Sequence, residues 1–102
     1  MNNDSQLIRL DGAEARRHID AGDMVVLDVR TAEEFNQGAL PGAMSLPWPR
    51  LKAVKVMDRE TPILLYCADG AKSRKAAEVL LALGFTHVYS MGAMAKYFQV
   101  AS

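Results

Sequence analysis

Cys67 is the residue whose surroundings most clearly favour chemistry. It follows the apolar run Ile63-Leu64-Leu65-Tyr66, and a stretch of good helix formers begins at Ser73. Between them the chain must turn tightly, and Gly70 can adopt a positive φ there without strain. Such a loop turns backbone N–H groups toward one point, where the positive end of the following helix adds to them. This arrangement stabilises a thiolate and predicts a nucleophile in an anion-binding cradle.

The loop around this cysteine is expected to supply the binding groups for a substrate anion. Lys72 and Arg74 add positive charge nearby. The residues expected to form the substrate-binding or anion-binding loop are Ala68, Asp69, Gly70, Ala71, Lys72 and Ser73. A free cysteine is more often a small buried apolar residue, but the strand, loop and helix around this one favour catalysis. The pattern alone leaves sulfur transfer and phosphate chemistry both open.

A second polar group follows another apolar run, at Asp28, Arg30 and Glu34. We expect these residues to be structural: Arg30 pairs with Glu34, and Asp28 accepts hydrogen bonds from backbone N–H groups. His18 and His87 are not placed to act as general bases, and none is needed if the cysteine is already a thiolate.

The composition excludes several kinds of partner. The chain has 12 basic and 12 acidic residues, so no net charge draws it to nucleic acid or to an anionic membrane. One cysteine and two histidines do not make a structural zinc site, and we expect no metal and no cofactor. The polar start Met-Asn-Asn-Asp-Ser-Gln does not resemble a secretory signal. With a single cysteine, this predicts a cytoplasmic protein.

Short strands that alternate with short helices must position these residues. This order predicts an α/β fold with a parallel sheet, whose functional groups lie at the carboxyl ends of the strands. Two capping boxes, Asp11 with Glu14 and Thr31 with Glu34, predict helix starts. The expected strands are 7–10, 24–29, 44–46, 63–66 and 88–89, and the expected helices include 11–21, 31–38, 47–57 and 73–83.

Two stretches of this sequence resemble rhodanese-like domains. Leu27-Asp28-Val29-Arg30-Thr31-Ala32-Glu33-Glu34-Phe35, followed by Gly38-Ala39-Leu40-Pro41-Gly42-Ala43, resembles the first signature of that family. Cys67-Ala68-Asp69-Gly70-Ala71-Lys72-Ser73 resembles its active-site loop, and Gly92-Ala93 with Tyr97 resembles its closing element. The resemblance covers nearly the whole chain, which we interpret as one domain, residues 1–102.

The resemblance implies a five-stranded parallel sheet flanked by helices on both faces, and a persulfide carried on Cys67. It implies thiosulfate or another persulfide as donor. Cyanide, a small thiol or a protein thiol would be the acceptor. The loop from Cys67 to Lys72 has the six residues typical of sulfurtransferases in the family. A seventh residue is typical of members that handle phosphate or arsenate.

Asp69 is the departure from the family pattern with the largest consequence. A carboxylate two residues from a thiolate repels both the thiolate and an anionic donor, so we expect thiosulfate to be a poor donor. Two other functions remain open. A non-catalytic binding or regulatory module is disfavoured by the intact cysteine. A cysteine phosphatase or arsenate reductase is disfavoured by the six-residue loop and by Lys72 in place of arginine.

Overall fold

The computed structural model describes residues 6–99, which form five parallel strands and the helices that cover them. The strands are β1 (Gln6–Arg9), β2 (Val25–Asp28), β3 (Met44–Ser45), β4 (Ile63–Cys67) and β5 (His87–Ala93), in the order β1-β5-β4-β2-β3. The expectation of no export signal rested mainly on residues 1–5, which lie outside the described part. Within residues 6–99, no helix is long and apolar enough to cross a bilayer.

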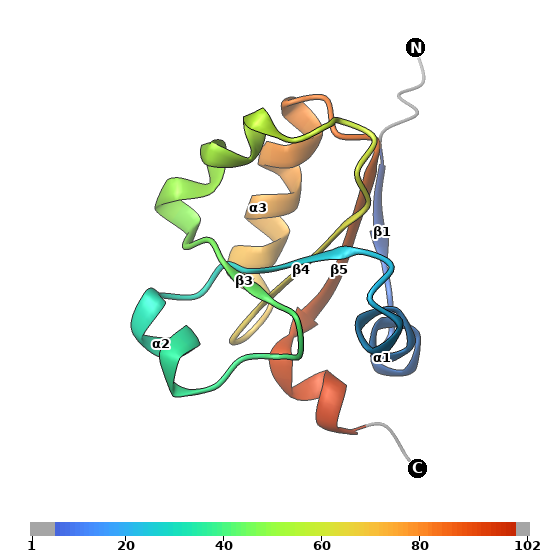
Figure 1. Ribbon diagram of the computed structural model, residues 1–102, viewed down its shortest axis with the longest axis vertical. Helices are drawn as coiled ribbons and strands as arrows, with labels where there is room; N and C mark the ends of the chain where they lie inside the picture. The colour runs from blue at the N-terminus through green and yellow to red at the C-terminus, as the bar shows by residue number, and fades with distance from the viewer. Residues whose placement is uncertain (1–5, 100–102) are drawn as a thin grey trace.

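Helices cover both faces of the sheet, as predicted (Figure 1). One face carries α1 (Gly12–Ala21) and the 3₁₀ helix η2 (Met94–Gln99), which pack against each other. The other carries α3 (Ala71–Ala82) and the 3₁₀ helix η1 (Trp48–Val56), whose buried side chains join one core cluster. The short helix α2 (Ala32–Gln37) has no buried residue.

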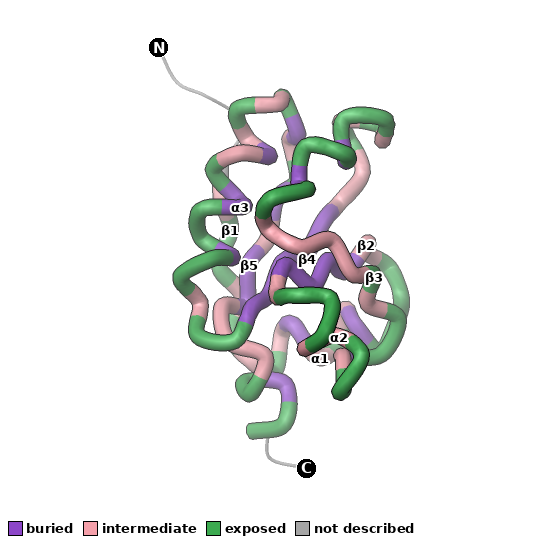
Figure 2. The backbone as a smooth tube through the Cα atoms, turned by 90° about the vertical axis from the view of Figure 1, so that its left-hand side faces the viewer, coloured by how far each residue is buried: buried purple, intermediate pink, exposed green. Residues whose placement is uncertain are grey.

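The central strand β4 is buried along its whole length, which explains its unbroken apolar sequence. Its side chains alternate between the two faces. Ile63, Leu65 and Cys67 belong to the cluster under α3 and η1. Leu64 and Tyr66 belong to the cluster under α1. Buried residues gather in the same way along β4, β5 and the inner side of α3 (Figure 2).

Both predicted capping boxes are present. The Asp11 side chain accepts from the Glu14 N–H and the Glu14 side chain from the Asp11 N–H, and Thr31 and Glu34 do the same at α2. Each box satisfies two N–H groups that a helix start would leave without partners.

Two predicted boundaries were wrong. The helix after the cysteine begins at Ala71 rather than at residue 73, because Gly70 at φ 95° supplies its N-cap. The last strand extends to Ala93, because β5 lies between β1 and β4 and pairs with both. The helix after Pro47 is a 3₁₀ helix.

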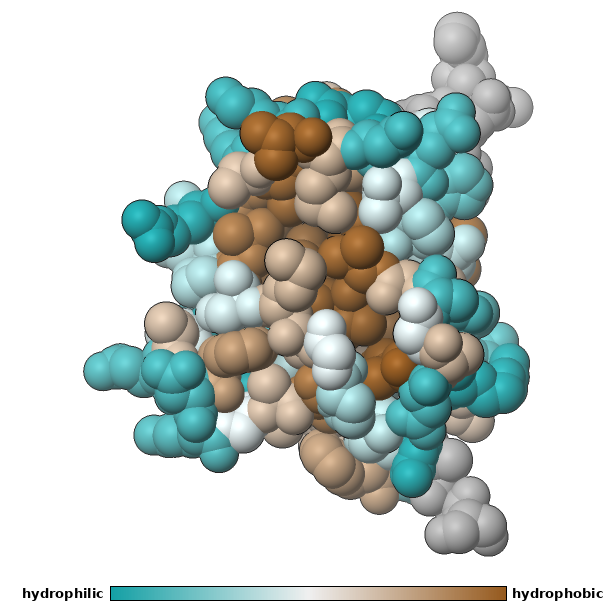
Figure 3. All heavy atoms as spheres, viewed as in Figure 1, coloured by the Kyte–Doolittle hydropathy of each residue, from teal (hydrophilic) through white to brown (hydrophobic). Residues whose placement is uncertain are grey.

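The surface in the view of Figure 3 shows apolar side chains across its middle, bordered by hydrophilic ones. Among the described residues, the large apolar side chains that are exposed include Met44, Val56 and Phe98. Apolar atoms contribute much of the surface of any folded protein, so these residues alone indicate no function.

Candidate active site

The carboxyl ends of the parallel strands bring the predicted site residues to one edge of the sheet. Cys67 ends β4, and Asp28 ends the neighbouring strand β2. β5 lies on the other side of β4 and pairs Ala93 with Cys67. Groups at this edge are the ones that a ligand meets in an open parallel sheet.

The sulfur of Cys67 sits inside the loop that follows it. The Gly70 N–H donates to Sγ at 2.8 Å, and the Ser73 N–H donates to Sγ at 3.3 Å. Both donors stabilise negative charge on the sulfur, and they come from the N-cap and the first turn of α3. The residue is only 1% exposed, so the sulfur is recessed.

Two buried serines continue the hydrogen bonds behind the sulfur. Ser73 Oγ lies 3.4 Å from Sγ and donates to the Gly70 carbonyl at 3.1 Å. Ser90 Oγ donates to Ser73 Oγ at 3.5 Å and accepts from the Gly92 N–H at 3.2 Å. These hydrogen bonds connect the loop to β5.

A bulge in β5 directly follows Ser90. Leu65 pairs with Ser90, but the next residue of β4, Tyr66, pairs with Gly92, so Met91 is the extra residue. Bulges often re-aim side chains beside active sites. Met91 turns into the core cluster under α1, where it is 1% exposed.

Asp69 points toward the sulfur. Its Oδ1 accepts from the Ala71 N–H at 3.0 Å and lies 3.9 Å from Sγ. A neutral thiol can donate to this carboxylate, whereas a thiolate faces it as a second negative charge. The carboxylate also occupies a backbone N–H that would otherwise be available to a bound anion.

Ala68, Ala71, Lys72 and Arg74 are exposed around the loop. Within the described residues, no hydrogen bond links Lys72 to the sulfur. Its ammonium instead contributes to lowering the pKa of Glu34, after the larger effect of the hydrogen bonds with Thr31.

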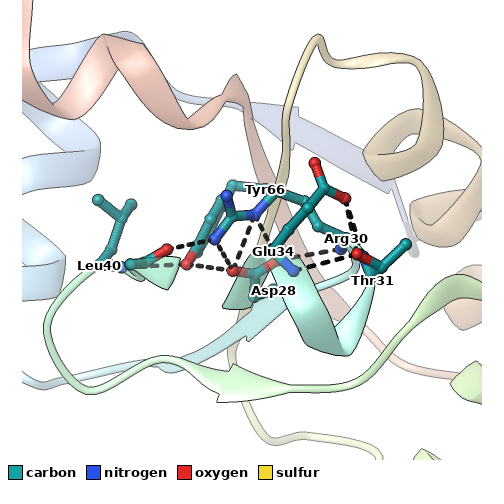
Figure 4. A network of polar contacts seen from close by, with 7 residues as sticks. Asp28, Arg30, Thr31, Glu34, Leu40 and Tyr66 are labelled. Atoms are coloured by element: carbon teal, nitrogen blue, oxygen red, sulfur yellow. Dashed lines mark hydrogen bonds and ion pairs between the residues drawn. The ribbon is translucent and has the colours of Figure 1, made fainter. Parts of the chain in front are cut away.

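The predicted pairing of Arg30 with Glu34 was wrong, because the partner of Arg30 is Asp28 (Figure 4). Arg30 Nε and Nη2 both donate to the buried Asp28 carboxylate, at distances down to 2.7 Å, and Nη2 also donates to the Gly38 carbonyl. The Glu34 carboxylate is held by its capping box. Asp28 does accept a backbone N–H, that of Arg30, as predicted.

Tyr66, which had no predicted role, completes this network. Its hydroxyl donates to Asp28 Oδ2 at 2.7 Å and accepts from the Leu40 N–H at 3.1 Å. Burial, followed by the hydrogen bond to Asp28, raises the pKa of Tyr66. The residue before Cys67 thus anchors β4 to β2 and to the loop after α2. The sequence feature that could have indicated this role is that Tyr66 directly precedes Cys67, so its side chain lies on the other face of the sheet.

The histidines lie away from this edge. His18 pairs with Asp23 near the end of α1, and His87 begins β5, at the end of that strand remote from the loop. Over the described residues, no three His, Cys, Asp or Glu side chains gather where they could hold a metal ion. Cys67 and its loop therefore remain the candidate active site.

Comparison with known proteins identifies the family that has this arrangement. The sequence profile described as Rhodanese-like domain matches residues 11–98. The chain belongs to this family. Its rhodanese-like domain therefore confirms the resemblance drawn from the Asp28 and Cys67 stretches, and the five-stranded parallel sheet confirms the predicted fold.

Several relatives of this rhodanese-like chain are sulfurtransferases. Thiosulfate sulfurtransferase PspE of Escherichia coli is 34% identical over 67% of this chain and 68% of its own length. Thiosulfate sulfurtransferase GlpE of Coxiella burnetii is 32% identical over 76% of this chain and 74% of its own length. A tRNA sulfurtransferase of Desulfurococcus amylolyticus is 36% identical over 74% of this chain, which corresponds to only 15% of that protein.

Solved structures agree on the fold. A rhodanese-related protein from Thermoplasma volcanium superposes with a TM-score of 0.77 at 26% identity, covering 90% of this chain and 91% of that one. A human single-domain sulfurtransferase gives a TM-score of 0.76 at 21% identity, covering 99% and 100%.

Proposed function

We propose that this rhodanese-like protein is a sulfurtransferase that carries sulfane sulfur as a persulfide on Cys67. The observation that carries the proposal is the pair of backbone N–H donors, from Gly70 and Ser73, on the Cys67 sulfur at 2.8 and 3.3 Å. The named relatives support the same class of reaction.

The chemistry needs one nucleophile and an external acceptor. The Cys67 thiolate attacks the outer sulfur of a donor such as thiosulfate, a new S–S bond forms, and sulfite leaves with the electron pair of the old bond. An acceptor then attacks the outer sulfur and releases the thiolate again. Cyanide becomes thiocyanate, and a thiol becomes a persulfide. Because the chain has one cysteine, no internal thiol can resolve the persulfide.

The loop's N–H groups stabilise the charge at both stages. The thiolate and the persulfide are both anions, and fixed donors do not have to reorganise as the charge moves outward. The recessed position of the sulfur, 1% exposed, favours donors narrow enough to enter the loop. Ser73 and Ser90 hold the loop from behind through their hydroxyls.

The test is the intact mass of the protein after exposure to a donor. Reduced protein is treated with thiosulfate and, separately, with a neutral dialkyl trisulfide, and the mass is measured before and after addition of cyanide. With thiosulfate we expect a gain of one sulfur atom, which cyanide removes with formation of thiocyanate. With the trisulfide, attack on the central sulfur expels one alkyl thiolate and leaves the central sulfur and the second alkylthio group on Cys67, and cyanide again removes one sulfur as thiocyanate.

Cys67→Ser is the matched control, because it keeps the size of the side chain while removing the thiol. Its thermal unfolding establishes that it is folded, and we expect no gain of sulfur. Sulfur transfer at the full rate in Cys67→Ser would refute the assignment. Failure of both donors to load the folded wild-type protein would favour the non-catalytic binding module.

A further inference from the structure

A hollow of about 420 Å³ lies beside the sulfur loop, between the carboxyl ends of β1 and β5, the start of α3 and η2. It shares Asp69, Gly70 and Ala71 with the loop, but Cys67 does not line it. Its volume falls in the range of pockets that bind small organic molecules and far exceeds the space of a water molecule.

Three cationic side chains from three different elements line this hollow. Arg9 ends β1, Arg74 lies in the first turns of α3, and Lys96 belongs to η2. Asp69 is the one acidic residue of the lining. Three positive charges and one negative charge leave the hollow with two positive charges in excess.

The cations of the hollow differ from Arg30 and Arg59, whose side chains are held by protein groups. Arg30 pairs with Asp28, and Arg59 donates to the carbonyls of Leu83, Lys55 and Met57. Within residues 6–99, the side chains of Arg9, Arg74 and Lys96 make neither a hydrogen bond nor an ion pair, so their donors remain available for a ligand.

The backbone of β5 brings Lys96 over this hollow. A Cβ placed on Gly92 would lie 3.4 Å from the Lys96 Nζ and 4.0 Å from the Gly70 Cα. The ammonium therefore lies over Gly92, in the bulged end of β5, and the backbone of Gly92 itself lies close to that of Gly70. Gly92 has a positive φ of 77°, which glycine adopts without strain and which a residue with a side chain would not.

We propose that this hollow is a second oxyanion site, separate from the sulfur loop, which takes a small organic molecule with two negative charges. Carboxylate and phosphate share the required chemistry, because both accept charge-assisted hydrogen bonds from arginine and lysine. The excess of two positive charges matches a dianion. The site is adjacent to the Cys67 loop through Gly70, yet its occupancy requires no sulfur transfer.

The experiment is a titration of the reduced wild-type protein at low and constant ionic strength, followed through backbone amide signals. Disodium succinate and inorganic phosphate are the two probes, and the neutral succinamide is the matched control. We expect shifts at Gly92, Ala93 and Ala71 with an anion and none with succinamide. A preference for succinate identifies a dicarboxylate site, and a preference for phosphate identifies a phosphate site. Added sodium chloride should weaken either.

Charge-removing variants test the residues. Arg9→Gln and Lys96→Gln should each weaken binding by about two- to fivefold, as expected for one partly exposed charge pair, and the double variant by more. Lys75→Gln removes an exposed charge of α3 that does not line the hollow, and should bind as the wild type does. Thermal unfolding establishes that each variant is folded.

The proposal is overturned if neither anion shifts the amides around the hollow. It is also overturned if the folded double variant binds as tightly as Lys75→Gln. Because these readouts measure binding, they stand whether or not Cys67 accepts sulfur. Failure to load sulfur would refute the proposed function alone.

Discussion

Replacing Asp69 with asparagine should convert thiosulfate into a better donor. The Asp69 Oδ1 lies 3.9 Å from the Cys67 sulfur and accepts the Ala71 N–H. Asparagine keeps an oxygen that can accept this N–H and removes only the negative charge. The substitution therefore separates the electrostatic role of the carboxylate from its role in holding the loop.

The distance sets the size of the effect. Two unit charges 3.9 Å apart interact by about 1 kcal/mol at the dielectric constant of water, and by about 4 kcal/mol at an effective value near 20. Because Asp69 is exposed, the lower figure is the appropriate one. About 1 to 1.4 kcal/mol corresponds to a five- to tenfold increase in kcat/KM for thiosulfate.

The assay compares two donors with cyanide as acceptor. Thiosulfate carries charge and a dialkyl trisulfide does not. An increase in kcat/KM that is the same for both donors reports the effect on the Cys67 thiolate, which no longer faces the Asp69 charge. A further gain for thiosulfate reports the lost repulsion of the donor. Glu78→Gln removes one negative charge farther along α3, where the side chain is exposed. It should change kcat/KM for neither donor.

Salt provides the second criterion. The Debye length falls from about 10 Å at 0.1 M to about 3 Å at 1 M, so the advantage of Asp69→Asn should shrink at high ionic strength. Equal thiosulfate kcat/KM for Asp69→Asn and wild type at low ionic strength would refute the reasoning. An identical gain for both donors would show that the carboxylate acts on the thiolate and not on the donor.

Tyr66→Phe should lower the free energy of unfolding by about 1 to 3 kcal/mol in urea titrations, because the Asp28 carboxylate loses a buried hydroxyl donor; an unchanged midpoint would contradict this. Burial raises the pKa of Tyr66, and the Asp20 hydrogen bond raises that of Tyr97. Each folded-state value exceeds the unfolded one, so their stabilisation is complete below about pH 10 and is lost above it. Urea titrations should show stability falling above pH 10, and less steeply in Tyr97→Phe. Gly70→Ala, at φ 95°, should cost about 1 to 2 kcal/mol in the same titrations and slow sulfur loading of Cys67; loading at the wild-type rate would show that this φ is not needed.

The elements that the sequence predicted well depend on contacts between near neighbours. Both capping boxes join residues three positions apart, so the spacing alone specifies them. The apolar run before Cys67 predicted a strand buried on both faces, and β4 is fully buried. The Asp28–Arg30 pair was also within reach, because residues two apart on an extended chain point to the same side.

Contacts between distant segments were decided by the tertiary structure. Ser90 meets Ser73 across 17 positions, and the Tyr66 hydroxyl meets Asp28 across 38. Arg9, Arg74 and Lys96 come together around the hollow only because β1 pairs with β5 and η2 follows it. No spacing pattern in the sequence predicts such long-range contacts.

The sequence by itself determined the local frame of the candidate site, which has Cys67 at the end of a strand and Gly70 at the start of a helix. The tertiary structure decided which groups surround that cysteine. The bulge at Met91 places Gly92, rather than Met91, opposite Tyr66. The register of β5 depends on its packing between β1 and β4, which no local pattern specifies, because a shift of one residue turns every side chain to the other face.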